Sequence, residues 1–260
     1  MKNLAIIGGG NLGKSILNGL ISSDIPLFEN IFITRRNADR IKDLGSETVT
    51  VTSDNILAVK NSDVVILAIK PFKIEAVLEE IKGELNSDKV VISVVTGTEI
   101  STIKKYTTAK IYRAMPNTAV AIKESITMIA GEHDEESNKK VKEIFDQVGK
   151  TIEIDEEMMG AATVFGASGI AFALRYLRAA TQGGIEIGFS SRVSQYIAAQ
   201  TVKGACELIL QNGTHPEEEI DKVTTPRGVT ISGLNEMEHQ GFSSALVKGL
   251  LTSFEKVKKM

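Results

Sequence analysis

The sequence predicts a doubly wound α/β domain that is followed by an all-α domain. Three observations support this prediction. Short Val- and Ile-rich segments alternate with helical patterns in the first half, a glycine-rich string follows the first of these segments, and strand patterns stop near residues 153–157. Alternating strands and helices are typical of a mostly parallel sheet with helices on both faces. We therefore expect one domain over residues 1–152 and a second over residues 153–260.

The expected strands are short runs that are apolar on both faces, as strands are when helices cover both sides of a sheet. They occupy residues 4–8, 31–34, 63–69, 90–95, 111–114 and 126–129. Helical patterns between them cover residues 12–21, 38–44, 74–81 and 135–148. Later helices are expected over about residues 156–187, 191–212 and 230–260, with a helix stop at Asn212-Gly213 and a new start at Pro216.

Composition excludes several classes of protein. The chain has 260 residues, of which 42% are hydrophobic and 24% charged, which is ordinary globular usage. A net charge of -3 argues against a nucleic-acid partner. The single cysteine, Cys206, cannot form an intrachain disulfide, and it favours a reducing cytoplasm. The histidines, His133, His215 and His239, do not have metal-ligand spacing, so we expect no metal.

An uncharged run over residues 158–174 resembles a membrane segment. Its length of about 17 residues falls just short of a bilayer span, and it contains several glycines. We interpret it as a helix that is buried, in part against a partner subunit. The sequence therefore predicts no membrane association.

The glycine-rich string Gly8-Gly9-Gly10-Asn11-Leu12-Gly13 fits the pattern G-x-G-x-x-G. It follows an apolar strand and opens an amphipathic helix, which is the context that a dinucleotide-binding turn requires. Gly8 allows the tight turn, Gly10 lets the backbone approach a pyrophosphate, and Gly13 lets helix and strand pack closely. The helix start offers amides and a positive dipole to phosphates. The sequence thus predicts a Rossmann domain with cofactor contacts at Gly8, Gly10, Asn11, Leu12 and Gly13.

The end of the second strand indicates which dinucleotide binds. NAD enzymes usually place Asp or Glu there, whereas this chain has Arg35 and Arg36. A guanidinium bonded to a 2′-phosphate contributes roughly 1.5–3 kcal/mol, about a 10- to 150-fold preference. We therefore favour NADPH, with NADH as the alternative; the arginines would otherwise be surface charges.

Two further stretches are expected at the cofactor. Ser53-Asp54-Asn55 precedes a short helical pattern. This run either only caps the helix, or Asn55 also reaches the adenosine side of the cofactor. Ala68, Lys70 and Pro71 end an apolar strand at the sheet edge where ligands bind, although Lys70 could also be a solvated lysine.

Several motifs together resemble the pyrroline-5-carboxylate reductase family, along nearly the whole chain and in the same order. Besides the glycine turn and Lys70-Pro71, they are Arg113-Ala114-Met115-Pro116-Asn117-Thr118, Ala199-Gln200-Thr201-Val202-Lys203-Gly204-Ala205 and Val223-Thr224-Thr225-Pro226-Arg227-Gly228-Val229-Thr230-Ile231-Ser232-Gly233-Leu234. The resemblance implies an NADP-dependent oxidoreductase that reduces the C=N bond of a cyclic imine, 1-pyrroline-5-carboxylate, to L-proline in the last step of proline biosynthesis. It also implies a helical dimerisation domain, a homodimer or higher oligomer of dimers, and an active site at the subunit interface.

The same resemblance assigns residues to the substrate. Thr230 would hydrogen-bond the ring nitrogen, and the substrate would also contact Thr225, Gly228 and Val229. The loop Met115, Pro116 and Asn117 would contact the cofactor. The chemistry of these residues agrees, because several amides at a helix start suit a carboxylate. The alternative is that Thr224, Thr225 and Thr230 are only helix caps.

This sequence departs from the family pattern at two positions of the last motif, and also at Ile170, where the family usually has a proline. Arg227 stands where the family commonly has a second glycine, and Val229 stands where it has Thr or Ala. An arginine in a loop that needs positive φ would be strained.

Two other functions stay open. The chain could be a two-domain reductase of the β-hydroxyacid dehydrogenase or ketopantoate reductase type, with Lys203 as proton donor. It could also be a nucleotide-binding regulator that has lost catalysis, for which Arg227 and Val229 are the best support.

Overall fold

The computed structural model describes residues 2–23, 25–131 and 134–259, so that His133 lies outside the described residues. The chain forms two compact units by its internal contacts. The first comprises Met1–Ser168 together with Phe254–Met260, and the second comprises Gly169–Ser253. This division lies 16 residues beyond the boundary that the sequence predicts, at residue 168 instead of 152.

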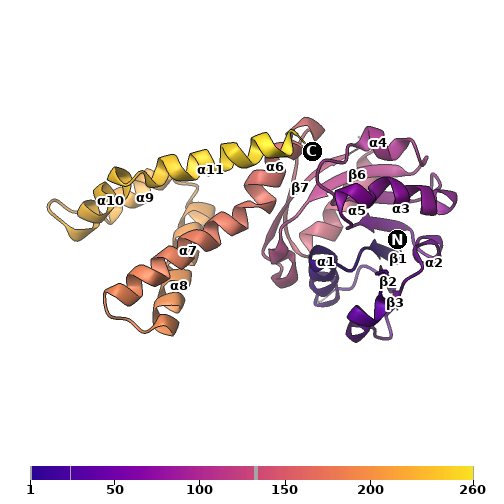
Figure 1. Ribbon diagram of the computed structural model, residues 1–260, viewed down its shortest axis with the longest axis horizontal. Coiled ribbons are helices and arrows are strands. Elements are labelled where there is room, and N and C mark those ends of the chain that lie inside the picture. Colours follow the sequence, from indigo (N-terminus) through magenta and orange to yellow (C-terminus); the bar gives the residue numbers. More distant parts are fainter. Residues whose placement is uncertain (1, 24, 132–133, 260) are drawn as a thin grey trace. The chain divides into compact units, whose positions relative to one another are not determined.

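The first unit is built on one eight-stranded sheet (Figure 1). Its order is β3-β2-β1-β4-β5-β6-β7-β8, and every pair is parallel except β6 with β7. The six strands expected from the sequence are confirmed. The strands are β1 (Asn3–Ile7), β2 (Asn30–Thr34), β3 (Val49–Thr52), β4 (Val64–Leu67), β5 (Val90–Ser93), β6 (Lys110–Met115), β7 (Ser125–Gly131) and β8 (Gly149–Glu153).

The two strands that sequence reasoning missed, β3 and β8, lie at the two edges of the sheet. An edge strand is not enclosed on all sides. β3 alternates Val with Thr, and β8, with the sequence Gly-Lys-Thr-Ile-Glu, contains one large apolar residue instead of an apolar run. They therefore lack the pattern by which the six inner strands were predicted.

Helices cover both faces of the sheet because each inner strand is apolar on both faces. Along β1, Leu4 and Ile6 join one buried cluster, and Ala5 and Ile7 join another. The first cluster includes residues of α1 and α5, and the second includes residues of α2, α3 and α4. These helices are α1 (Asn11–Ile21), α2 (Asn55–Lys60), α3 (Ile74–Ile81), α4 (Ile100–Lys104) and α5 (Glu135–Asp146).

Short 3-10 turns complete this unit. The segment predicted as a helix over residues 38–44 is 3-10 in form, and Ile41 leaves helical geometry there with a φ of -136°. The turns are η1 (Ala38–Leu44), η2 (Pro71–Lys73), η3 (Lys82–Glu84), η4 (Thr118–Ile122) and η5 (Glu156–Met158).

The helical segment after β8 packs on the sheet, which is why the first unit continues past residue 152. It comprises η5, α6 (Met159–Ala162) and a π turn, η6 (Thr163–Ala167). Met159 is fully buried and shares a cluster with Met115 and Met128 of the sheet. The continuous helix expected over residues 156–187 is therefore interrupted by the π turn.

The second unit is helical throughout. Gly241, with a φ of 78°, divides the predicted last helix into two. The helices are α7 (Gly169–Glu186), α8 (Ser191–Asn212), α9 (Pro216–Lys222), α10 (Val229–His239) and α11 (Phe242–Val257), the last of which runs on into residues of the first unit. α7 and α8 pack closely, and the Ser194 hydroxyl donates to the Thr181 carbonyl over 2.7 Å.

Much apolar surface of the second unit is exposed. Ile187 and Leu210 are each 77% exposed, whereas Thr181 and Ser194 are the only residues of this unit in the buried class. The stretch Glu156–Glu186 is also long and apolar enough to cross a membrane, judged by length and composition alone. Of the 18 residues that make up its most apolar part, 22% are buried. Surface of this kind needs a partner to cover it.

Candidate functional site

The glycine turn lies between β1 and α1 and touches the end of β4. Gly8 has a φ of 116°, and a Cβ atom there would overlap the carbonyl oxygen of Ala68. A Cβ atom on Gly13 would overlap the carbonyl oxygen of Gly8. The structure thus brings Gly8, Gly13 and Ala68 together, and the fold itself requires glycine at the first two positions.

Gly10 has a different environment. A Cβ atom there would meet nothing within 4 Å, so its own chain does not require glycine. Gly10 is the N-cap of α1, no side chain caps this helix, and its first turn contains no acidic residue. Asn11 is exposed and Leu12 half-buried. Open space in front of uncapped amides fits a pyrophosphate, as the motif predicts.

The two arginines after β2 have different surroundings. The Gly9 N–H donates to the Thr34 carbonyl over 2.6 Å, and Arg35 Nη1 donates to the Gly9 carbonyl over 2.9 Å. Arg35 therefore holds the glycine turn against β2. Arg36 is exposed and lies just after β2, at the carboxyl ends of the parallel strands near the glycine turn. From the sequence, the two arginines are expected to act as a pair. In the structure, Arg35 bonds the Gly9 carbonyl, whereas the Arg36 side chain is exposed.

The cap of α2 that the sequence predicts within Ser53-Asp54-Asn55 is confirmed, and it is Asp54. Asp54 caps this helix, since its Oδ1 accepts from the Leu57 N–H over 2.8 Å. Asn55 is instead the first helical residue, and its Nδ2 donates to both carboxylate oxygens of Glu80, over 3.0 and 3.2 Å. The expected contact of Asn55 with the adenosine stays a prediction.

The residues after β4 and β6 also reach the carboxyl edge of the sheet. Lys70 is exposed, and Pro71 begins the turn η2. Met115 and Pro116 are buried, so only their backbone could meet a cofactor. Asn117 uses its side chain within the protein: Oδ1 accepts from the Ala119 N–H over 3.0 Å, and Nδ2 donates to the Gly166 carbonyl over 3.3 Å.

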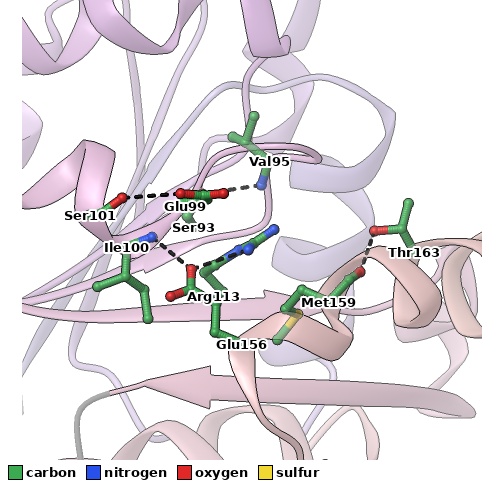
Figure 2. Close-up of polar contacts among 9 residues, drawn as sticks. All are labelled: Ser93, Val95, Glu99, Ile100, Ser101, Arg113, Glu156, Met159 and Thr163. Carbon is green, nitrogen blue, oxygen red and sulfur yellow. Dashed lines mark hydrogen bonds and ion pairs between the residues drawn. The ribbon is translucent and has the colours of Figure 1, made fainter. Parts of the chain in front are cut away.

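A buried arginine lies in the middle of β6 (Figure 2). Arg113 is 6% exposed, and its Nη1 pairs with Glu156 Oε1 over 3.2 Å. The same carboxylate oxygen accepts from the Ile100 N–H at the start of α4 over 2.7 Å. Within the described residues, Arg113 Nε has no hydrogen-bond partner. Sequence reasoning missed this pair, although a charge inside an apolar strand is itself the signal that a partner must exist.

The predicted substrate residues lie in the second unit, where Thr225 and Pro226 precede α10. Arg227 has a φ of 62°, which confirms the positive φ expected where the family has glycine. Gly228 is the N-cap of α10, and no side chain caps this helix. The threonines therefore do not cap the start of α10, and Thr224 Oγ1 donates to the Ile220 carbonyl near the end of α9.

The start of α10 is consequently available to a ligand. Because the cap residue is Gly228, no capping side chain accepts from the amides of the first turn. Val229 is 90% exposed and Thr230 is half-buried. Such amides suit a carboxylate. In residues 2–23, 25–131 and 134–259, there is no group of three or more His, Cys, Asp or Glu side chains that could hold a metal ion.

Comparison with known proteins gives matches to two family models. Residues 156–260 match the model described as pyrroline-5-carboxylate reductase dimerisation. Residues 3–97 match the model described as NADP oxidoreductase coenzyme F420-dependent. The exposed apolar helices of the second unit thus lie in the segment that matches a dimerisation model.

The most similar relatives include two proteins of Dictyostelium discoideum. Pyrroline-5-carboxylate reductase 1 is 42% identical over 268 residues, which cover 97% of this chain and 49% of the relative, so that the chain spans about half the length of that protein. Pyrroline-5-carboxylate reductase 2 is 41% identical over 277 residues, which cover 99% of this chain and 93% of the relative.

Among solved structures, the Plasmodium falciparum pyrroline carboxylate reductase with NADP bound has a TM-score of 0.90 to this chain. It is 25% identical in sequence, and the match covers 99% of this chain and 97% of the other. Sequence and structure agree from end to end with the resemblance that the motifs suggested. The chain belongs to the pyrroline-5-carboxylate reductase family.

Proposed function

We propose that the chain reduces 1-pyrroline-5-carboxylate to L-proline with NADPH, the last step of proline biosynthesis. The open space at Gly10, before the uncapped amides of α1, is the observation that carries the proposal. The fold does not need glycine at this position, whereas a pyrophosphate approaching the backbone does. The exposed guanidinium of Arg36 lies at the same edge and supports a 2′-phosphate.

Each part of the chain has a definite task in this reaction. When bound, the reduced dinucleotide supplies the hydride. The amides of Val229 and Thr230 at the start of α10 bind the substrate carboxylate. Thr225 and Gly228, whose N–H donates to the Thr225 carbonyl over 2.8 Å, contact the substrate beside them. The Thr230 hydroxyl accepts a hydrogen bond from the ring N–H, which keeps the imine protonated and oriented. A protonated imine is already electrophilic, so the residues need only align it and exclude water.

We further propose a cytoplasmic homodimer, or a higher oligomer of dimers. The exposed apolar side chains of α7 to α11 support burial against a second copy. The same burial explains the apolar stretch Glu156–Glu186 without a membrane.

The decisive experiment follows NADPH oxidation by the purified chain with 1-pyrroline-5-carboxylate and identifies the product. We expect turnover and proline. Binding of NADPH without turnover would instead favour a regulator. A Lys203→Ala variant separates the remaining alternative, because a reductase that uses this lysine as proton donor would lose its activity.

Replacing Arg36 by alanine is expected to weaken the binding and use of NADPH but not of NADH. The loss of a charge-assisted contact to the 2′-phosphate should lower kcat/KM for NADPH about 10- to 150-fold. The value for NADH, which has no such phosphate, should change little. Arg35→Ala should lower both values, because Arg35 also holds the Gly9 carbonyl. Steady-state kinetics with both cofactors measure this, and an unchanged preference in Arg36→Ala would contradict the assignment.

A further inference from the structure

The Asn117 side chain joins the loop at the end of β6 to the π turn η6. Its Nδ2 donates to the Gly166 carbonyl over 3.3 Å, and its Oδ1 accepts from the Ala119 N–H over 3.0 Å. The backbone N–H of Asn117 donates to Ser125 Oγ over 3.1 Å. Both ends of one carboxamide are therefore used within the protein, and one of them bonds a residue 49 positions further along the chain.

The π turn places the Gly166 carbonyl where it can accept this bond. The Ser168 N–H donates to the Thr163 carbonyl over 2.9 Å, five residues back, so the turn contains one residue more than an α turn. An extra residue shifts the register of the helix and turns carbonyls toward donors outside it. A Cβ atom at position 166 would displace the end of the Met128 side chain, which packs against this turn.

A second contact holds the other end of the same helical segment. Arg113, four residues before Asn117 on the chain, pairs with Glu156 over 3.2 Å. Between the two contacts, Met159 packs with Met115 in one buried cluster. β6 and the segment 156–167 are thus joined at two points, and the second point lies at the loop.

We propose that Asn117 is a positioning residue, whose bond to the Gly166 carbonyl holds the backbone of Met115 and Pro116 in the form that binds the dinucleotide. In this proposal the loop backbone contacts the cofactor, whereas the Asn117 carboxamide bonds only groups of the protein. The inference rests on the proposed function, because it requires a dinucleotide at this edge of the sheet.

Two substitutions at this residue separate its two bonds. Asn117→Asp keeps an acceptor for the Ala119 N–H but removes the donor to Gly166 and sets a negative charge against its carbonyl. Asn117→Ala removes both bonds. We expect each variant to raise the Kd for NADPH about tenfold, which corresponds to about 1.4 kcal/mol, and to leave the KM for the imine within about twofold at saturating NADPH. Thr118→Ala, in the same turn and exposed, is the matched control and should bind NADPH like the parent chain.

Binding is measured by calorimetry on folded protein, and thermal unfolding is followed in parallel. If Asn117→Asp binds NADPH as tightly as the parent chain, the bond to Gly166 has no role in binding and the inference is wrong. A lowered Tm with an unchanged Kd would equally overturn it, because the residue would then be merely structural. A parent chain that does not bind NADPH would overturn the proposed function, and that outcome is visible before any variant is made.

Discussion

Gly10→Ala is expected to raise the Kd for NADPH by roughly 100-fold or more while the protein stays as stable as before. A Cβ atom at Gly10 meets nothing within 4 Å in the chain itself, and the backbone φ of -79° is open to alanine. The methyl group would instead occupy the space where the motif predicts the pyrophosphate. A 100-fold change corresponds to about 2.7 kcal/mol, and calorimetric titration with NADPH measures it.

The neighbouring glycines provide the contrast. Gly83→Ala is the matched control, since a Cβ atom there also meets nothing within 4 Å and the residue lies in another turn. Its affinity for NADPH should not change. Gly13→Ala should destabilise the fold, because its Cβ atom would overlap the Gly8 carbonyl oxygen. If Gly10→Ala bound NADPH normally, the first turn would not be the phosphate site, and the proposed function would lose its main support.

Glu156→Ala is expected to lower the free energy of unfolding by about 3 kcal/mol. The substitution leaves the guanidinium of Arg113, which is 6% exposed, without its carboxylate and the Ile100 N–H without its acceptor. Removing one member of a buried ion pair costs about 3–5 kcal/mol. The lower end applies here, because the Glu156 side chain is 34% exposed.

Urea unfolding at a single protein concentration measures this loss, since association of subunits also contributes to stability. Glu156→Gln should cost less, because its amide oxygen can still accept both hydrogen bonds. Glu157→Ala, which changes an exposed neighbour, should stay within about 0.5 kcal/mol of the parent chain. Equal stabilities for Glu156→Ala and Glu157→Ala would show that the pair contributes nothing to the fold.

Local pattern was enough to predict much of this protein. The six inner strands were predicted because burial on both faces makes each an apolar run. The glycine turn was predicted because each glycine of the motif has a backbone requirement. At Gly8 and Gly13 this requirement is seen as a close approach to a carbonyl oxygen. Arg227 was singled out by its place in a loop motif, and it has the positive φ that this place implies.

Contacts between distant segments were decided only in the tertiary structure. Arg113 meets Glu156 across 43 residues and Asn117 meets Gly166 across 49, and neither pairing has a spacing that a local pattern could reveal. Arg35 and Arg36 look alike in the sequence and differ only because one reaches the Gly9 carbonyl. The sheet edges and the limit of the first unit likewise depend on what packs beside them.

The sequence by itself determined the six inner strands and the dinucleotide turn, because these follow from periodicity and from backbone requirements at neighbouring positions. The family followed from the resemblance of its motifs. The tertiary structure alone decided which polar side chains are used within the protein and which remain available to a ligand. The physical reason is that a buried donor or charge must find its partner wherever the fold brings one within hydrogen-bond distance, however far away that partner lies along the chain.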